Sequence, residues 1–465
     1  GYVSGFSGFG KIVAVSTMPS LNNDGDKVTI SRGQKTIDQV EYTDDWYGSD
    51  SKSGGGYTLE RINPNDVCGI ENNWVGSENA DGGTPGQANS VLDSSSSSAI
   101  EIRDIRFKSL SELSVSLTHR IDSTAALGVY LGNVATNYQY ASENSFTITS
   151  DDNYGRGQSY TLSIDSVASC EGEINSSLSA SVYLHDSGEV IINEVLFNPR
   201  GSGTDFVELL NASDAVINLR DWSFGYYDSN DSLRFNSLST SSLFISNDEQ
   251  LCFNEDEDDL AENYPLLFEN NLRIMNLPSY SNDTGDVWLF DQFGGLMDQL
   301  HYSDNWHFPL IKDPDGVSLE RLSPATSGLD QDNWHSASAT DNFATPGYVN
   351  SQFYPESTIG VGWSLSEEYI SPDNDGYQDV VRIEYLISEP GHSATIRVYN
   401  DKGVLIKSLT SNALLGSSGS FVWDGTNDDG EKARTGIHVI MVESFDLVGS
   451  LSRKRLPVIV ATRLR

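Results

Sequence analysis

Basic side chains are scarce in this sequence. Its 465 residues include 28 Lys and Arg against 67 Asp and Glu, which gives a formal net charge of −39 at pH 7. A chain this acidic repels phosphate groups, so binding of nucleic acid by counterion release and docking of a basic patch onto anionic lipid are both disfavoured. Cations are the favoured small ligands of such a chain.

Cysteine and long apolar runs are also rare. Cys68, Cys170 and Cys252 are widely separated, a spacing typical of neither a disulfide framework nor a structural zinc site. No apolar run approaches the ~18 residues that a membrane-spanning helix needs. The first residues, Gly1–Gly5, do not have the charged-then-apolar pattern of a signal peptide. The sequence therefore predicts no transmembrane segment.

Catalytic signatures are missing as well. The seven histidines form no His-x-His or His-Glu-x-x-His pattern. The sequence has no Gly-x-Ser-x-Gly elbow, no Gly-Lys-Ser/Thr phosphate loop and no Gly-x-Gly-x-x-Gly fingerprint. Pairs of carboxylates arise anywhere among 67 acidic residues, so they do not indicate glycoside hydrolysis. We expect no enzyme within this stretch.

What the sequence does have is a dense series of strand signals. Short β-branched or alternating runs, such as 190–192, 206–209 and 394–399, are separated by Gly, Asn and Asp turns. Only residues 256–268 could hold a helical turn or two, and the acidic run 255–259 is most simply a solvated loop. The pattern predicts an all-β fold.

An internal repeat is the most informative feature of the chain. Residues 19–90 align with residues 278–351 at an offset of 259 to 261, which indicates that one structural unit occurs twice. The matching segments, first copy before second, are Pro19-Ser20 and Pro278-Ser279, Asn23-Asp24 and Asn282-Asp283, Asp38-Gln39 and Asp298-Gln299, Tyr42 and Tyr302, Trp46 and Trp306, Leu59-Glu60-Arg61 and Leu319-Glu320-Arg321, Asn73-Trp74 and Asn333-Trp334, Thr84-Pro85-Gly86 and Thr345-Pro346-Gly347, and Asn89-Ser90 and Asn350-Ser351.

The second copy begins with a front half, residues 190–222, that has no counterpart in the first copy. We therefore expect the partner strands of the first copy to lie upstream of Gly1. On this interpretation the chain is the C-terminal part of a longer protein.

The repeat and two linkers divide the chain into modules. The predicted segments are 1–90, the C-terminal part of a first domain; 91–99, a Ser-rich linker; 100–187, a small antiparallel spacer sandwich; 190–350, the complete second copy; 351–358, a second linker; and 359–465, a last module.

The complete copy resembles the lamin-tail domain of secreted bacterial proteins. The resemblance covers 190–350 fully and 1–90 in part, and it implies an immunoglobulin-like β-sandwich used for attachment or interaction, without catalytic residues to transfer. It rests on the segments Ile192-Asn193-Glu194-Val195, Phe206-Val207-Glu208-Leu209-Leu210-Asn211, Leu219 and Trp222, closed by Leu319-Glu320-Arg321, Asn333-Trp334 and Thr345-Pro346-Gly347.

The last module resembles the immunoglobulin-like domain of the flagellar hook-capping family. Similar modules end many surface proteins of the Bacteroidota, where C-terminal β-sandwiches act as sorting signals for type IX secretion. Residues 97–187 resemble a bacterial immunoglobulin-like spacer. The resemblance of the last module rests on Ser371-Pro372-Asp373-Asn374-Asp375-Gly376, on 396–403, on Phe421-Val422-Trp423-Asp424-Gly425 and on Thr435-Gly436-Ile437.

One segment of the last module has the spacing of a cation site. Ser371, Asp373 and Asp375 place oxygen atoms at alternate positions before a glycine, as in a calcium loop, and Asp379 offers a further oxygen. The twelfth position is Arg382 rather than a bidentate Glu, so a strand-initiating turn is the alternative. The sequence requires no cofactor, and calcium is its candidate ligand.

The repeated Glu-Arg pair, Glu60-Arg61 and Glu320-Arg321, admits two interpretations. An acid and a guanidinium beside an indole, here Trp74 or Trp334, can form a platform for a sugar or a peptide. Because both copies carry the set, a structural clasp next to a buried tryptophan is the more economical interpretation.

We interpret the chain as all-β, a tandem series of immunoglobulin-like β-sandwich modules. Two of them are lamin-tail-like, one of these partial, and two are other immunoglobulin-like domains. The predicted function is non-catalytic binding or scaffolding at the bacterial cell surface or in secreted form, associated with the outer membrane. The resemblance implies an outer-membrane secretion or barrel protein as partner of the C-terminal domain. Surface polysaccharide or another surface protein is a second kind of partner, and nucleic acid is not expected.

Two alternatives stay open. The modules could be targeting appendages of a secreted nuclease, phosphatase or protease whose catalytic domain lies upstream. The chain could also be a subunit of an outer-membrane barrel complex. Catalytic motifs before Gly1 would favour the first, and a stoichiometric barrel partner would favour the second.

Overall fold

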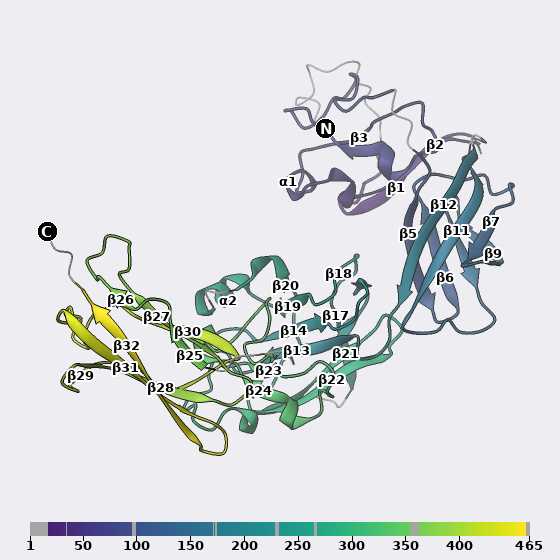
Figure 1. Ribbon diagram of the computed structural model, residues 1–465. Coiled ribbons are helices and arrows are strands. Elements are labelled where there is room, and N and C mark those ends of the chain that lie inside the picture. The colour runs from purple at the N-terminus through teal and green to yellow at the C-terminus, as the bar shows by residue number, and fades with distance from the viewer. Residues whose placement is uncertain are drawn as a thin grey trace. The chain divides into compact units, whose positions relative to one another are not determined.

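The computed structural model describes residues 17–33, 35–94, 99–170, 172, 174–227, 232–264, 267–354 and 362–461. The chain divides into two compact units, Gly1–Leu184 and His185–Arg465, each described by itself. Strands dominate both units (Figure 1), and the predicted all-β fold of tandem sandwich modules is confirmed. In the described ranges, no helix has the length and apolar character needed to cross a membrane. Residues 95–98 and 355–358 of the predicted linkers lie outside the described residues.

Unit 1 opens with the first copy of the repeat. Strand β1 (Gly25–Arg32) pairs antiparallel with β2 (Lys35–Thr43). The short helix α1 (Asp50–Ser53) follows, and then β3 (Leu59–Arg61) pairs with β4 (Trp74–Gly76). Two-stranded ladders bury little apolar surface on their own, so this copy depends on its neighbours for stability.

The spacer module, also in unit 1, is an antiparallel sandwich. Its alternating sequences place every second side chain inside: Leu113, Val115 and Leu117 are fully buried, as are Leu162 and Ile164 from the facing sheet. One sheet has the order β5 (Ile102–Ser109), β6 (Glu112–Leu117), β10 (Ser145–Thr149), β9 (Tyr138–Ser142), and the other has the order β12 (Ile174–Leu184), β11 (Gln158–Ala168), β7 (Gly128–Leu131), β8 (Val134–Ala135).

A disulfide joins the first copy to the spacer. Cys68 and Cys170 are bonded, with their Cα atoms 5.7 Å apart, whereas Cys252 is free and buried in unit 2. Their spacing of 102 residues did not suggest a pair, because sequence separation says nothing about cysteines brought together by the packing of two modules.

Unit 2 begins with the complete copy of the repeat. A six-stranded sheet, in the order β20, β19, β14, β13, β23, β24, faces a four-stranded sheet in the order β17, β16, β21, β22. The bounds are β13 Val190–Leu196, β14 Phe206–Asn211, β15 Ile217–Asn218, β16 Ser223–Tyr227, β17 Leu233–Ser237, β18 Phe244–Ile245, β19 Gln250–Asn254, β20 Leu272–Ile274, β21 Thr284–Phe290, β22 Leu296–Ser303, β23 Leu319–Arg321 and β24 Trp334–Ser336.

Strand β13 is the centre of this copy. It pairs with β14 on one side and β23 on the other, and all seven of its residues are buried. A strand buried on both faces needs a nearly continuous apolar run, which Val190-Ile191-Ile192 and Val195-Leu196 supply on either side of Asn193 and Glu194.

The acidic run that we predicted as a solvated loop is a helix start. Helix α2 spans Glu257–Asn263, and the Asp256 side chain accepts hydrogen bonds from the Asp258 and Asp259 N–H groups at 3.1 and 3.3 Å. Acidic residues favour a helix N-terminus because they accept from its unpaired N–H groups and interact favourably with the helix dipole.

The last module is a second sandwich within unit 2. Its core includes Ile396, Val398, Trp423, Ile440 and Val458, all fully buried. A three-stranded sheet has the order β25 (Gly362–Leu365), β27 (Val381–Leu386), β30 (Ser418–Trp423), and a five-stranded sheet has the order β26 (Tyr369–Ile370), β32 (Leu451–Val460), β31 (Gly436–Phe445), β28 (Ser393–Asn400), β29 (Leu405–Leu414).

Hydrogen bonds tie this module to the complete copy. The Ser417 N–H donates to the Ser351 carbonyl (2.8 Å), and Gln352 Nε2 donates to the Leu415 carbonyl (3.1 Å). The Tyr385 hydroxyl lies 2.8 Å from the Thr340 hydroxyl and accepts from the Gly416 N–H at 3.2 Å. Backbone and side chains together therefore fix this contact.

Tyr385→Phe is expected to loosen the contact, at a cost of about 1–2 kcal/mol, because the Gly416 N–H and the Thr340 hydroxyl both lose a buried partner. Amide exchange at residues 416–417 should become faster while β31 is unaffected. Tyr369→Phe, an exposed tyrosine of the same module, is the matched control. Unchanged exchange in both variants would show that the hydroxyl does not hold the contact.

Candidate functional site

The predicted cation residues lie in the turn between β26 and β27. One carboxylate oxygen from each of Asp373, Asp375 and Asp379 lies within 4.8 Å of the others. Ser371 lies at the base of the turn, where its N–H donates to the Gln378 carbonyl at 2.7 Å. The structure thus brings the three predicted carboxylates together.

Backbone amides already occupy the Asp379 carboxylate. It accepts from the N–H groups of Gly376 (2.8 Å), Asn374 (2.6 Å) and Asp373 (3.0 Å). These bonds, that from Gly376 first, lower the pKa of Asp379. Positive φ angles of 64° at Asn374 and 86° at Gly376 close the turn. This geometry favours the strand-initiating turn, and calcium binding stays a prediction.

Asp379→Ala is expected to open this turn with or without calcium, because three N–H groups lose their acceptor. Amide exchange at residues 373–376 should rise by about 10-fold or more. The calcium prediction is tested separately by calorimetric titration of the wild type and of Asp375→Asn. Heat of binding that the Asp375→Asn change removes would establish the cation site, and identical traces would eliminate it.

The repeated arginines pair with aspartates rather than with the adjacent glutamates. Arg61 lies 3.1 Å from Asp38, and its guanidinium stands 4.9 Å from the centre of the Trp74 ring. In the second copy Arg321 lies 2.6 Å from Asp298. Both aspartates belong to a matched segment of the repeat, Asp38-Gln39 in the first copy and Asp298-Gln299 in the second. In each copy the ion pair joins two strands of the same module, which supports the clasp interpretation.

Three glutamates lie side by side across the six-stranded sheet. Glu194 is opposite Glu208 on one side and Glu320 on the other, and all three are fully buried. Loops that close over the sheet donate to them: the Ser318 hydroxyl and the Thr345 N–H (2.9 Å) to Glu194, the Gly347 N–H (2.7 Å) to Glu208, and the Ser351 hydroxyl (2.8 Å) and the Gln352 N–H (2.8 Å) to Glu320. Asn193 Nδ2, from strand β13 itself, donates to Glu208 at 2.8 Å.

The Thr345 hydroxyl joins two of these carboxyl groups. It lies 2.9 Å from Glu194 Oε2 and 2.8 Å from Glu320 Oε1. A hydroxyl has one proton to donate. Both contacts are therefore fully satisfied when one carboxyl group accepts from the hydroxyl and the other, in its protonated form, donates to it. Burial, reinforced by the neighbouring carboxylates, raises the pKa of all three glutamates to about 8.

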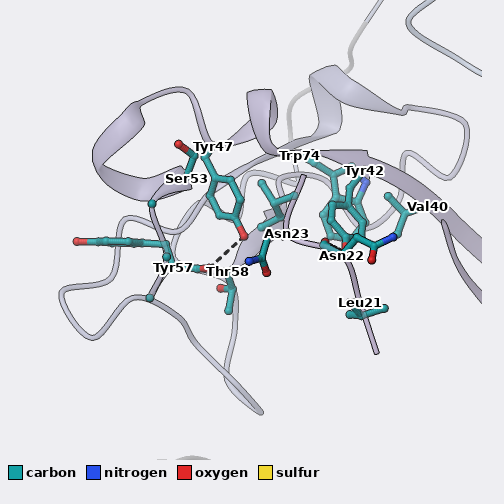
Figure 2. A pocket seen from close by; sticks show the side chains of 14 residues that line it. Leu21, Asn22, Asn23, Val40, Tyr42, Tyr47, Ser53, Tyr57, Thr58 and Trp74 are labelled. Carbon is teal, nitrogen blue, oxygen red and sulfur yellow. Dashed lines mark hydrogen bonds between the residues drawn. The ribbon is translucent and has the colours of Figure 1, made fainter. Parts of the chain in front are cut away.

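A groove opens in the first copy, and Figure 2 shows its lining. It has a volume of about 460 Å³ and is bordered by Val40 and Tyr42 of β2, Thr58 and Leu59 at the start of β3, and Trp74 of β4. Nothing in the sequence pattern pointed to a cavity here. Its lining combines aliphatic and aromatic side chains with glycines, asparagines and hydroxyl groups.

Comparison with known families recognises two of the modules. Residues 184–304 match the model of the Lamin Tail Domain, and residues 371–446 match that of the FlgD Ig-like domain. Apart from Leu184, the last residue of unit 1, both matches fall in unit 2. The predicted resemblances of the complete copy and of the last module are thus confirmed at the level of these immunoglobulin-like modules. No curated protein matches the chain.

Several solved structures are similar to parts of this chain. Dimeric latent PorU from Porphyromonas gingivalis is 11% identical, with 78% of this chain and 34% of that chain covered, at a TM-score of 0.19. PorZ, a surface component of the type-IX secretion system of the same organism, is 10% identical, with 94% of this chain and 56% of that chain covered, at a TM-score of 0.18. A Bacteroides ovatus protein, SGBP-B, in complex with a mixed-linkage heptasaccharide, is 10% identical, with 79% of this chain and 72% of that chain covered, at a TM-score of 0.14. This chain spans about a third of the PorU chain, and similarities this low carry no argument about function.

Proposed function

We propose that the chain is a non-catalytic cell-surface or secreted protein whose β-sandwich modules bind partners or hold them in place. The C-terminal domain attaches it to, or exports it through, an outer-membrane type IX secretion machinery. The observation that carries the proposal is the succession of a lamin-tail module and a FlgD Ig-like module in one chain.

The disulfide supports a location outside the cytoplasm. Disulfides such as Cys68–Cys170 form and persist in oxidising compartments and are rare in the reducing cytosol. The excess of acidic residues keeps a chain of exposed modules soluble and separate. Both features suit a protein at the cell surface.

Deletion of the last module tests the proposal in a Bacteroidota host. Protease treatment of intact cells should degrade the wild-type protein, and removal of residues 359–465 should leave it inside the cell, protected. Removal of the spacer, residues 100–187, is the control and should not block export. An outer-membrane barrel protein should copurify with the wild type in fixed ratio and be lost on deletion of residues 359–465.

Intact mass and N-terminal sequencing of the natural protein distinguish the proposed function from its rival, a secreted enzyme for which these modules are appendages. A product carrying an upstream domain with a nucleophile or metal-ligand motif would make these modules accessories of an enzyme. Further sandwich repeats upstream would agree with the binding function. Retention of the wild-type protein in the cytoplasm would contradict the proposed location outright.

A further inference from the structure

The four-stranded sheet of the complete copy has two unlike faces. On its inner side, Phe224, Val287 and Leu289 are fully buried in the core of the sandwich. Side chains alternate between the two faces of a strand, so the residues between these belong to the outer face. Four aromatic side chains and one leucine that solvent reaches form what we call the aromatic face, namely Tyr227, Leu233, Phe235, Trp288 and Phe290.

The rings of the aromatic face form two perpendicular pairs. Tyr227 lies against Trp288, with ring centres 5.0 Å apart and planes at 86°, and Phe235 lies against Phe290 at 5.2 Å and 84°. Gly225 of β16 lies between β17 and β21, opposite both Phe235 and Trp288. A Cβ atom at Gly225 would be 2.5 Å from the Phe290 ring. The glycine therefore lets this ring lie across its strand, and the aromatic face continues over all three strands.

The first copy of the repeat does not share the tryptophan. Thr29 lies opposite Gln39 in the first copy, as Trp288 lies opposite Gln299 in the second. The first copy therefore has a threonine at the position of the indole, whereas the inner residue that follows is apolar in both copies. A side chain that the fold required would recur. Exposed apolar patches that the fold does not require mark binding surfaces.

Polar groups border the aromatic face along β22. Gln299 lies opposite Trp288, and His301 lies opposite Asp286, with Nδ1 2.9 Å from the carboxylate. The side chains of that pair are 58% and 45% exposed, so a ligand can reach them. Within the four described strands, no Lys, Arg or Glu alternates to this face, and Asp286 is its only Asp; Arg234 alternates to the other side of β17. The face is thus nearly uncharged in a chain of net charge −39.

We propose that the aromatic face binds a neutral polysaccharide of β-linked pyranoses whose hydroxyl groups are all equatorial. The inference rests on the proposed binding function and gives it a site and a class of ligand. In such sugars the axial C–H groups leave both faces of the ring apolar, and the hydroxyl groups point outward from its rim. The C–H faces stack on the aromatic rings, and the rim hydroxyls bond to Gln299, Asp286 and His301.

The size and charge of the face favour this occupant over others. Neighbouring strands are about 4.8 Å apart, so rings on β17 and β21 extend over roughly 10 Å. Along the five residues of β17 the face is about 17 Å long. This footprint suits a short stretch of a sugar chain and is small beside the about 800 Å² that each partner gives to a stable protein interface. Acidic polysaccharides and anionic lipids are repelled by the net charge.

Calorimetric titration of the whole chain with cellohexaose, a linear β-1,4-linked glucose hexamer, tests the proposal. We expect saturable binding. Maltohexaose, whose α links curve the chain, should bind at least 10-fold more weakly because it cannot lie flat on the rings. The hexamer of galacturonic acid should not bind, since its carboxylates are repelled. Equal binding of all three sugars would overturn the proposal.

Tyr227→Ala and Phe235→Ala locate the site. These side chains are 58% and 52% exposed, so the chain should still fold, and each change should weaken binding of cellohexaose at least 10-fold. Tyr377→Ala, at a site in the last module that is 68% exposed, is the matched control and should leave binding unchanged. Absence of cellohexaose binding, or unchanged binding in the first two variants, would overturn the proposal. Self-association of the chain in sedimentation that Tyr227→Ala abolishes would overturn it in favour of a second copy as occupant.

Protease treatment of intact cells keeps this inference separate from the proposed function. A chain that reaches the cell surface but does not bind cellohexaose would overturn the polysaccharide site alone. A chain that binds cellohexaose but stays in the cytoplasm would overturn the proposed location alone.

Discussion

Replacement of Glu194 by glutamine is expected to stabilise the complete lamin-tail copy at pH 8 and to change it little at pH 5. The glutamine amide reproduces a protonated Glu194: its oxygen accepts from Ser318 and from the Thr345 N–H, and its NH₂ donates to the Thr345 hydroxyl. That hydroxyl is then free to donate to Glu320, so Ser318, Thr345 and Glu320 all keep their partners, and one N–H of the glutamine NH₂ is used. At pH 8 the variant also lacks one buried negative charge, for a gain of about 1–3 kcal/mol.

The pH dependence of the wild type follows from the same groups. The folded-state pKa values of Glu194, Glu208 and Glu320 are raised to about 8 from an ordinary value of 4.5. Between these values the native state holds more protons than the unfolded state, so stability falls as the pH rises. The slope for each such proton is about 1.4 kcal/mol per pH unit. Acidification from pH 8 to pH 5 should therefore stabilise this copy.

Amide exchange of β13, followed at several pH values, measures this effect locally, because the two units need not unfold together. Glu194→Leu should destabilise the copy by about 2–4 kcal/mol at both pH values, since Ser318 and Thr345 lose their acceptor. Glu384→Gln, at an exposed site of β27, controls for net charge. Two results would contradict a protonated carboxyl group in this cluster. One is a stability of β13 that does not depend on pH, and the other is a Glu194→Gln variant that is less stable than the wild type at pH 8.

Local patterns were readable from the sequence, and contacts between distant segments were not. The turn with Asp373, Asp375 and Asp379 lies within a few residues, so spacing alone brought its carboxylates together. The repeat was equally visible, because it compares residues with residues. The all-β fold followed from alternation and turn residues, which are local properties of the chain.

The glutamate cluster could not be predicted in this way. Glu194, Glu208 and Glu320 meet only because β13 lies between β14 and β23, and strand order in a sheet is not a property of any single segment. The available signal was a glutamate, next to Asn193, inside the otherwise apolar strand Val190–Leu196, where a charge is costly without partners. The groove of the first copy is a further case, because its lining residues come from segments that are separate in the sequence: residues 21–23, strand β2, residues 53–59 and Trp74 of β4.

Removal of the Cys68–Cys170 disulfide should produce the largest loss of stability in unit 1. The bond closes a loop of 102 residues, and in the chain-entropy account a loop of that size stabilises the folded state by about 4–5 kcal/mol. The other contacts of the first copy with the spacer gather around the disulfide: a β-bridge pairs Gly69 with His119, the Arg120 N–H donates to the Cys68 carbonyl at 2.8 Å, and the Ile70 N–H donates to the Thr118 carbonyl at 3.0 Å. His119 also lies 3.4 Å from Asp66. Its two-stranded ladders are marginally stable on their own and cannot compensate for the loss.

Thermal unfolding of the variant with Cys68→Ala and Cys170→Ala measures the effect. The unfolding midpoint of unit 1 should fall by on the order of 10 °C, and reductant should bring the wild type to the same value while leaving the variant unchanged. Cys252→Ala, a change at the buried free cysteine of unit 2, is the control and should keep the wild-type response to reductant. If reductant leaves the wild-type midpoint unchanged, the packing of Gly69 and Cys68 against the spacer is sufficient, and the bond contributes no stability to the first copy.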